Sequence, residues 1–359
     1  MTLLFDKKDM GVIDLGLRKI GEGHGVFIIA EVGINHQGDV NIAVKLIEEA
    51  KKCGADAVKF QKRSINRILT REGLDMPYEN PNSFGNTYGE HKQALELNES
   101  DYKELKSCCE ENDIIFCASG WDEESIDFLD EIGVPFFKMA SADLTNHPLL
   151  DHTSRKGKPI FLSTGMANMQ DVKDAYRVVS LNNDQVGILQ CTSTYPSKFD
   201  EINLNVINTY KREFPDAVIG FSGHENGIAI PPVAVALGAC IIEKHFTLDR
   251  TMKGSDHAAS LEPQGFVKMV RDIHHVSEAL GSYDKAIQKS EEPIFTKLAK
   301  SIVSLRDISA GSLLKSEDLT TKGPGTGISP ARISDVIGRT VAVNIPADTV
   351  IKEDFIQCR

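Results

Sequence analysis

Apolar and polar positions follow a repeated pattern between residues 27 and 246. Short apolar runs end in a polar or glycine-containing cluster, and an amphipathic, helix-like stretch follows. The eight runs are 27–33, 56–62, 114–120, 135–141, 159–165, 186–193, 218–224 and 240–246. Strands alternating with helices are typical of an α/β protein with a parallel sheet. Eight units in this length favour a closed (β/α)8 TIM barrel over an open doubly wound sheet, and no G-x-G-x-x-G motif follows the first strand.

Two stretches depart from this regular pattern. Residues 63–97, between the second and third runs, hold three glycines and two prolines. A connection this long on the active-site side predicts a lid or a binding element, although a simple surface excursion stays open. After the last barrel helix, a polar segment leads into short β-type runs broken by turn residues. We therefore predict a barrel domain over 1–281, a linker over 282–296 and a small β-rich domain over 297–359.

The composition is that of an ordinary globular protein, with 41% hydrophobic and 26% charged residues. The net charge is −12, with acids and bases mixed, so we expect no nucleic-acid partner. The first ten residues are charged too early for a signal peptide, and no apolar stretch is long enough for a membrane span. The seven cysteines lack C-x-x-C spacing, which favours reduced, mostly packed thiols in a cytoplasmic protein.

Polar side chains stand at the carboxyl ends of the predicted strands, which converge on one face of a barrel. Lys59 and Lys138 lie inside apolar runs, where a buried ammonium group needs an anion or a lowered pKa. With the surrounding hydroxyls they favour a bound anionic ligand, and a structural ion pair is the alternative. The set is Glu31, Lys59, Gln61, Ser119, Lys138, Ser141, Ser163, Thr164, Gln190, Ser193, Ser222, His224, Glu243 and His245.

Two histidines end neighbouring strands. His224 and His245 close the seventh and eighth runs, so their rings can meet at the barrel mouth. Two imidazoles make half of a divalent metal site and leave the other positions to water and substrate oxygens. Glu243 and Asp256 lie near them in sequence. The pair favours a metal site, while hydrogen-bonded structural histidines are the alternative.

Ten segments resemble the sialic acid synthase family in order and spacing. They are IIAEVGINHQGD, AVKFQK, YGEHK, FCASGWD, PFFKMASAD, LSTGM, LQCTSTYP, GFSGHENG, EKHFTLD and KGSDHAASLEP. The C-terminal part resembles the antifreeze-like SAF (β-clip) domain of that family. The resemblance implies a metal-dependent transferase that condenses phosphoenolpyruvate with N-acetylmannosamine or N-acetylmannosamine 6-phosphate. The products would be N-acetylneuraminate or its 9-phosphate, plus phosphate.

The resemblance also implies roles for individual residues. His224 and His245 correspond to ligands of Mn²⁺ or Mg²⁺, Glu31 to an acidic residue near the reacting centre, and Asp256 to a sugar-contacting loop. Ser193 stands where some bacterial members have Asn, two places before the tyrosine, and we count it among the substrate-binding residues. The positions that fall on the phosphoenolpyruvate pocket are Lys59, Ser119, Lys138, Ser141, Ser163, Tyr195 and Ser222.

The chain departs from the family pattern in the appended domain. Many bacterial members have Lys-Arg-Pro-Gly where this chain has Lys322, Gly323, Pro324 and Gly325. Their arginine reaches the sugar in the barrel of a partner subunit. The resemblance implies such a homodimer here, in which one subunit's small domain covers the other's barrel. Lys322 could replace the arginine, although an exposed lysine on a turn is the simpler interpretation.

Several alternatives stay open. The acceptor could be mannose 6-phosphate, giving a deaminated nonulosonate, or a diamino sugar, giving legionaminate or pseudaminate. Similarity of the long loop to animal-type enzymes tilts the expectation toward a phosphorylated acceptor, and charges in or beside that loop could serve it or simply be solvated; they are Lys62, Arg63, Arg71 and Lys92. A non-catalytic carbohydrate- or ice-binding protein would leave the lysines and histidines without a role. A plain metal-dependent hydrolase would need no lysine pair.

Overall fold

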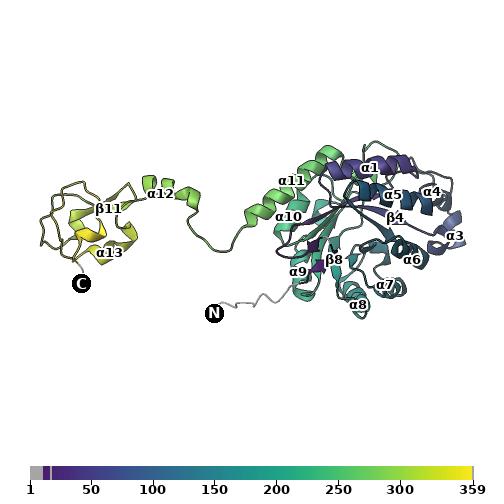
Figure 1. The fold of residues 1–359 in the computed structure, drawn as a ribbon, viewed down its shortest axis with the longest axis horizontal. Coiled ribbons are helices and arrows are strands. Elements are labelled where there is room, and N and C mark those ends of the chain that lie inside the picture. Colours follow the sequence, from purple (N-terminus) through teal and green to yellow (C-terminus); the bar gives the residue numbers. More distant parts are fainter. Residues whose placement is uncertain (1–10, 17, 358–359) are drawn as a thin grey trace. The chain divides into compact units, whose positions relative to one another are not determined.

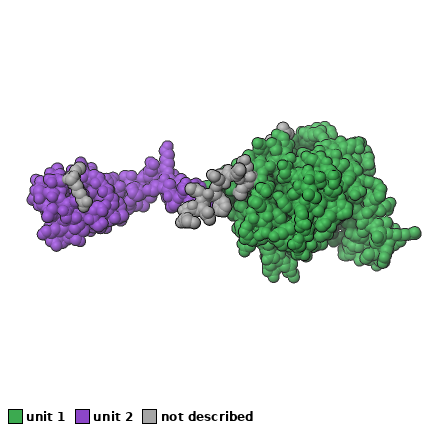
Figure 2. Space-filling view, turned by 90° about the horizontal axis from the view of Figure 1, so that it is seen from below, with its two compact units in different colours: residues 1–281 green, residues 282–359 purple. Residues whose placement is uncertain are grey.

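The computed structural model describes residues 11–16 and 18–357, and the chain divides into two compact units. The first unit is Met1–Gly281 and the second is Ser282–Arg359 (Figure 2). The second unit begins at the residue where the sequence places the start of a linker. None of the helices in the described part of the chain combines the length and the apolar character needed to cross a bilayer.

Eight parallel strands of the first unit close into a barrel, in the order β10-β3-β4-β5-β6-β7-β8-β9. Each falls within one of the eight predicted apolar runs, so the predicted TIM barrel is confirmed. The strands are β3 Phe27–Gly33, β4 Ala57–Lys62, β5 Ile115–Gly120, β6 Phe137–Met139, β7 Ile160–Ser163, β8 Val186–Cys191, β9 Val218–Gly223 and β10 Ile241–His245.

Helices surround the barrel (Figure 1). The first, α1, shows why they form: the Asp39 side chain accepts a hydrogen bond from the Asn41 N–H group at its start. Its buried residues, including Ala43, Leu46 and Ile47, recur at helical spacing and face the strands. The helices that follow the strands are α1 Val40–Lys52, α5 Glu99–Glu111, α6 Glu123–Glu131, α7 His147–Ser154, α8 Met169–Ser180, α9 Val206–Glu213, α10 Ile230–Ala236 and α11 Pro263–Leu280.

The barrel interior is apolar at one end and polar at the other. Phe136 and Phe161 stack with ring centroids 4.4 Å apart, and Phe27 packs edge-on to both. The hairpin of β1 (Ile13–Asp14) and β2 (Lys19–Ile20) adds apolar side chains to this end. The sequence pattern did not predict the hairpin, because two-residue strands have no measurable periodicity. Since this end is filled, the polar strand ends are left to form the site.

The long connection after β4 contains short helices. They are α2 Ile65–Ile68, α3 Arg71–Asp75 and α4 Tyr88–Ala94. Thr87 caps α4 through a capping box with Glu90. The expected lid or binding element is thus an ordered segment, part of which faces the barrel mouth.

The second unit has its own apolar core, formed around Ile302, Leu319, Val341 and Ile351. Its regular elements are α12 Glu292–Leu298, α13 Ile333–Val336 and an antiparallel pair, β11 Ser301–Ser304 with β12 Leu319–Lys322. The predicted β-type run over 338–355 makes isolated bridges rather than a named strand, for example Leu313 with Thr340. Turn residues interrupt the pairing there before a ladder can extend. Helix α12 begins inside the predicted linker.

Candidate active site

A cavity of about 560 Å³ opens at the carboxyl ends of the barrel strands. Its volume lies within the ~300–1,000 Å³ range of small-molecule sites. Side chains from widely separated segments meet there because parallel strand ends converge. Every residue to which the sequence analysis gave a role in catalysis, substrate binding or metal binding lines it: Glu31, Lys59, Ser119, Lys138, Ser141, Ser163, Ser193, Tyr195, Ser222, His224, His245 and Asp256.

Two lysines and two glutamates form a buried network on the cavity floor, which we call the cavity network. Lys59 Nζ lies 2.6 Å from Glu31 Oε2 and 3.8 Å from Glu243 Oε2. Lys138 Nζ lies 3.5 Å from Glu243 Oε1, and its one hydrogen bond goes to a backbone carbonyl, that of Met139. All four side chains are at most 5% exposed. An ammonium group has three donors, so Lys138 keeps donor capacity for a ligand.

This network changes the argument that led to an anionic ligand. The sequence suggested two buried lysines in need of an anion, but Glu31 and Glu243 already balance their charge. Burial raises the pKa of Glu31 to about 7, despite the nearby Lys59. A carboxyl group with this pKa can take up a proton near neutrality. Protonation of Glu31 would leave the floor with a net positive charge that suits an anion.

Glu243 is the fixed anion of the network. Burial alone would raise the pKa of its carboxyl group, but Lys138 and Lys59 lower that pKa to about 2. Ser222 Oγ donates a hydrogen bond of 2.9 Å to Glu243 Oε1. Burial lowers the pKa of Lys138, although Glu243 opposes the shift. The two glutamates therefore differ: Glu243 stays ionised, while Glu31 is able to exchange a proton.

Hydroxyl groups line the wall beside this floor. Lys59 Nζ donates to Ser119 Oγ over 3.1 Å, and the Gly165 N–H group donates to Ser141 Oγ over 3.0 Å. A Cβ atom at Gly165 would lie 2.0 Å from Ser193 Oγ, so only glycine allows this approach. Ser163 Oγ is buried without a hydrogen-bond partner among the described residues. Such an unsatisfied hydroxyl favours a polar ligand at this wall.

The two predicted imidazoles meet at the barrel mouth. The ring centroids of His224 and His245 are 5.3 Å apart, and the Tyr195 ring lies 4.2 Å from that of His224. His224 Nδ1 lies 2.9 Å from the Thr192 carbonyl oxygen, which assigns the proton to Nδ1 and frees Nε2. Burial lowers the pKa of His245 to about 3, so its ring is neutral.

The residues at this place fit a divalent metal ion. His245 Nδ1 is buried and has no hydrogen-bond partner in the described part of the chain, and Asp256 Oδ2 lies 3.8 Å from it. A neutral imidazole with an open nitrogen is the form that binds a metal. Within residues 11–16 and 18–357, no group of three or more His, Cys, Asp or Glu side chains is arranged for a metal. The remaining ligand positions would therefore fall to water and substrate.

Sequence reasoning misplaced two polar residues and missed others. The Thr164 hydroxyl bonds to the Leu189 carbonyl, and the Gln190 amide to the Ile202 carbonyl, and neither residue lines the cavity. Both point out of the barrel because strand side chains alternate. Cys191, next to Gln190, lines the cavity instead. The long connection also contributes lining residues that the sequence did not single out for the site, and these are Tyr78, Asn82, Tyr88 and His91.

The six described cysteines are free thiols, as predicted. Cys358 lies outside the described residues. Cys191 Sγ is 3.5 Å from Ser141 Oγ and 3.8 Å from His224 Nδ1. This thiol is therefore part of the site rather than of the core.

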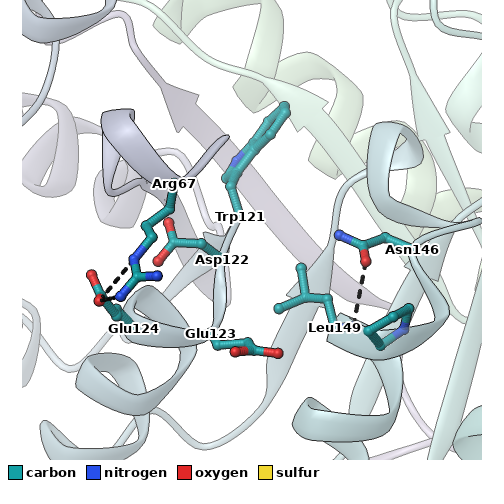
Figure 3. Close-up of a pocket in the computed structure, with 8 residues that line it drawn as sticks. Arg67, Trp121, Asp122, Glu123, Glu124, Asn146 and Leu149 are labelled. Atoms are coloured by element: carbon teal, nitrogen blue, oxygen red, sulfur yellow. Dashed lines mark hydrogen bonds and ion pairs between the residues drawn. The ribbon is translucent and has the colours of Figure 1, made fainter. Parts of the chain in front are cut away.

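A second cavity, of about 280 Å³, lies beside the start of α6 (Figure 3). Figure 3 shows the Arg67 guanidinium bound to Glu124, and Asn146 accepting from the Leu149 N–H group. Asp122 caps α6, and Glu124 pairs with Arg67. Trp121 is its one residue in common with the first cavity, and none of the predicted site residues lines it.

The barrel and its polar mouth define an enzyme of the (β/α)8 class. Residues 46–285 match the NeuB family and residues 299–357 match the SAF domain. The chain therefore belongs to the NeuB family, the sialic acid and related nonulosonic acid synthases, with an appended SAF domain.

Relatives cover nearly the whole chain. N-acetylneuraminate-9-phosphate synthase of Mus musculus is 46% identical, over 95% of either chain. N,N'-diacetyllegionaminic acid synthase of Legionella pneumophila is 37% identical, over 95% of this chain and 98% of its own. The crystal structure of N-acetylneuraminic acid synthetase from Leptospira borgpetersenii, in complex with citrate, superposes with a TM-score of 0.71 at 34% identity. It covers 79% of this chain and 95% of that one. The chain is thus a synthase of this family.

Proposed function

We propose that this synthase condenses phosphoenolpyruvate with N-acetylmannosamine or N-acetylmannosamine 6-phosphate. The products are N-acetylneuraminate or its 9-phosphate, and inorganic phosphate. The observation that carries the proposal is one cavity in which the cavity network adjoins the imidazole pair. The phosphate and carboxylate groups of phosphoenolpyruvate need cations and hydrogen-bond donors, which the cavity network and the hydroxyls beside it offer. The aldehyde of the acceptor needs a polarising group, for which the imidazole pair offers a place.

The donor would lie over the lysines. Lys138 has spare donors, and the hydroxyls of Ser119, Ser141 and Ser163 stand beside it in the cavity wall. Groups on rigid strand ends are already oriented before the substrate arrives, so no reorganisation is needed during reaction. When Glu31 takes up a proton, the floor becomes positive and favours the donor's anionic groups. These residues therefore bind and orient phosphoenolpyruvate.

The chemistry forms one carbon–carbon bond. C3 of phosphoenolpyruvate attacks the aldehyde carbon of the open-chain sugar, and positive charge develops at C2. Water adds to C2, and the C2–O bond to phosphate then breaks. Glu31, with its pKa near 7, would give its proton to the aldehyde oxygen as the bond forms and then, ionised, accept the proton of that water. Its second role is to hold Lys59, and the two roles are compatible.

The acceptor aldehyde would lie near His224 and His245. A divalent cation bound there, Mn²⁺ or Mg²⁺, would polarise the aldehyde oxygen as a Lewis acid. The neutral His245 ring and the Nε2 atom of His224 would hold it. Tyr195 covers both rings and limits the access of water, while Asp256 and Ser193 stand where hydroxyl groups of the sugar can bond.

We also propose a homodimer in which the SAF domain of one subunit covers the barrel of the other. The cationic intermediate must be kept from bulk water, which an open mouth would not do. In this structure Lys322 pairs with Asp348 on the surface of its own unit, at 2.5 Å. Mass measurement in solution tests the assembly, and a fully active monomer would overturn it.

The experiment that tests the reaction is product mass spectrometry with phosphoenolpyruvate and each sugar. We expect a nine-carbon product from an N-acetylmannosamine acceptor, and phosphate release only when sugar is present. Phosphate release without sugar would indicate a hydrolase instead. Conversion only of mannose 6-phosphate or of a diamino sugar would identify that sugar as the acceptor instead. A diamino sugar is the second candidate acceptor, because one relative is an N,N'-diacetyllegionaminic acid synthase.

A further inference from the structure

An arginine lies buried close to His91 and Lys92, two residues that line the cavity, without a full set of partners. The Arg63 side chain is 1% exposed, and its Nε donates to Glu96 Oε2 over 3.1 Å. Its Nη1 and Nη2 atoms are buried and have no hydrogen-bond partner among the described residues. Glu96 also pairs with Lys62 at 3.2 Å, so one carboxylate serves two cations. A positive charge therefore stays uncompensated at this point, and buried donors without partners are costly.

Lys92 adds a second positive charge next to Arg63. It lies on α4, lines the cavity and makes no ion pair within the described residues. Burial, and then the charge of Arg63, lower the pKa of Lys92 to about 8. Its Nζ atom lies 5.1 Å from the centroid of the Tyr88 ring, and the charges of Asp256 and Glu96 only partly offset this lowering of the pKa. Lys92 and Arg63 repel each other, and an anion bound in the cavity next to Lys92 would relieve this repulsion.

His91 supplies a neutral donor at the same place. Its Nδ1 atom accepts a hydrogen bond of 3.2 Å from the Phe84 N–H group, so the ring proton lies on Nε2. Burial lowers the pKa of His91, which keeps the ring neutral. The charge of Asp256 acts on His91, but this carboxylate lies 3.8 Å from His245 Nδ1. Lys253 Nζ stands over the Phe84 ring at 4.8 Å and adds further positive charge.

Other basic residues of this segment are already occupied or exposed. Arg71 is 94% exposed and lies 3.9 Å from Asp75, and Arg67 pairs with Glu124 at the second cavity. Among the described residues of this connection, Lys92 on α4 is the cation that lines the first cavity. We call this end of the cavity, formed by Tyr88, His91 and Lys92 in front of Arg63, the α4 pocket.

We propose that the α4 pocket binds the phosphate monoester of a phosphorylated acceptor sugar, with Lys92 and His91 as direct partners and Arg63 as the charge behind them. This inference rests on the proposed function, because the aldehyde of the same sugar must reach the imidazole pair. The residues of the α4 pocket and the imidazole pair line the same cavity. The phosphate would then stand on the carbon farthest from the aldehyde. Dianionic phosphate compensates Lys92 and Arg63 together, which a neutral hydroxyl group cannot do.

The test compares N-acetylmannosamine 6-phosphate with N-acetylmannosamine as acceptors, each with saturating phosphoenolpyruvate. In Lys92→Met we expect the ratio of the two kcat/KM values to fall by about 10- to 100-fold, through KM for the phosphorylated sugar. Lys92→Arg restores a positive charge and should recover most of the ratio. Lys103→Ala, an exposed lysine on α5, is the control and should leave the ratio unchanged.

Each outcome separates this inference from the proposed function. A selective loss in Lys92→Met supports the phosphate site, and Arg63→Met adds support if its melting curve shows a folded protein. An unchanged ratio, or an equal loss with both sugars, overturns the phosphate site and leaves the condensation standing. If the unaltered protein converts neither sugar, the proposed function fails, and the inference fails with it.

Discussion

Strand β10 places buried charges on both of its faces, and the two faces are built differently. Glu243 and His245 point into the cavity, where Glu243 is shared between two lysines. Lys244, between them, points out of the barrel and pairs with Glu225 at 2.8 Å. The two side chains of this outward pair are 0% and 1% exposed. The outward pair is balanced in charge and does not line the cavity, whereas the inward face leaves donor capacity and an open imidazole nitrogen in the cavity.

The outward pair has one structural task. Glu225 folds back beside Gly223, where a Cβ atom would lie 2.5 Å from Glu225 Oε2, so glycine makes room for the pair. Lys244 also donates to the Glu225 backbone carbonyl, which ties the segment after His224 to β10. A buried charge alone is thus no sign of function. The difference lies in whether the neighbouring groups leave atoms unsatisfied toward a cavity.

The largest expected effect concerns the outward pair. Lys244→Met removes one partner and leaves Glu225 buried and unpaired, which should lower the free energy of unfolding by about 3 to 5 kcal/mol. Turnover per folded molecule should stay normal. Urea unfolding and active-site titration measure the two quantities. The double variant Lys244→Met/Glu225→Gln should recover part of the stability, and its failure to do so would argue against the pair as the cause.

The second effect concerns the cavity face of the same strand. His245→Ala should lower kcat by about a hundred- to a thousandfold, the several kcal/mol that a Lewis acid contributes. The free energy of unfolding should fall only by what the packing of the ring against Tyr195 and His224 contributes, since the Nδ1 atom makes no hydrogen bond among the described residues. Kinetics with titrated Mn²⁺ or Mg²⁺, and with a chelator, provide the measurement. Near-normal turnover of the variant in chelated buffer would remove the metal proposal.

A smaller effect is expected at the cavity floor. Lys138→Ala should raise KM for phosphoenolpyruvate by about 10- to 100-fold, because the spare donors of the ammonium group are lost. KM for the sugar should change less, since the proposed place of the acceptor is at the imidazole pair. Steady-state kinetics with each substrate varied in turn gives both values. Equal changes in the two would place Lys138 outside the donor site.

Glu31 should produce a pH dependence of stability. Its ordinary pKa is 4.5 and its pKa in the folded protein is about 7, so the folded state holds the proton more tightly. The stabilisation from this proton is complete below pH 4.5 and disappears as pH rises through 7. Between these values the unaltered protein should lose about 3 kcal/mol more than Glu31→Gln, at about 1.4 kcal/mol for each pKa unit. Urea unfolding across this pH range tests it; parallel curves would contradict the raised pKa.

The smallest effect is expected far from the cavity. Lys322 and Asp348 are 52% and 72% exposed, and Lys322→Ala should change the free energy of unfolding by less than about 0.5 kcal/mol. If Lys322 is only a surface partner, activity should not change either. A marked rise of KM for the sugar, at concentrations where the protein is dimeric, would instead give Lys322 the role of the missing arginine.

The sequence was sufficient for the barrel and for the residues around its mouth. Eight apolar runs of similar spacing specify the strands, and period-two alternation specifies which side chains share a face, as with Lys59 and Gln61. The same rule, applied to Thr164 and Gln190, would have excluded them. It would also have selected Cys191, which the sequence analysis counted among the packed, apolar thiols. The β1–β2 hairpin and the isolated bridges of the second unit could not be predicted from the sequence, because segments of so few residues show no hydrophobic periodicity.

The sequence by itself determined which chemical groups gather at one end of the barrel, because strand order and alternation are local properties that short-range patterns encode. Only the tertiary structure decided how those groups share charge. The partners of Lys59, Lys138 and Lys244 come from strands and turns distant in sequence, and so does the Glu96 carboxylate that Arg63 and Lys62 share. Pairing depends on distances between such segments. Whether a buried cation is satisfied or open to a ligand is therefore set by packing.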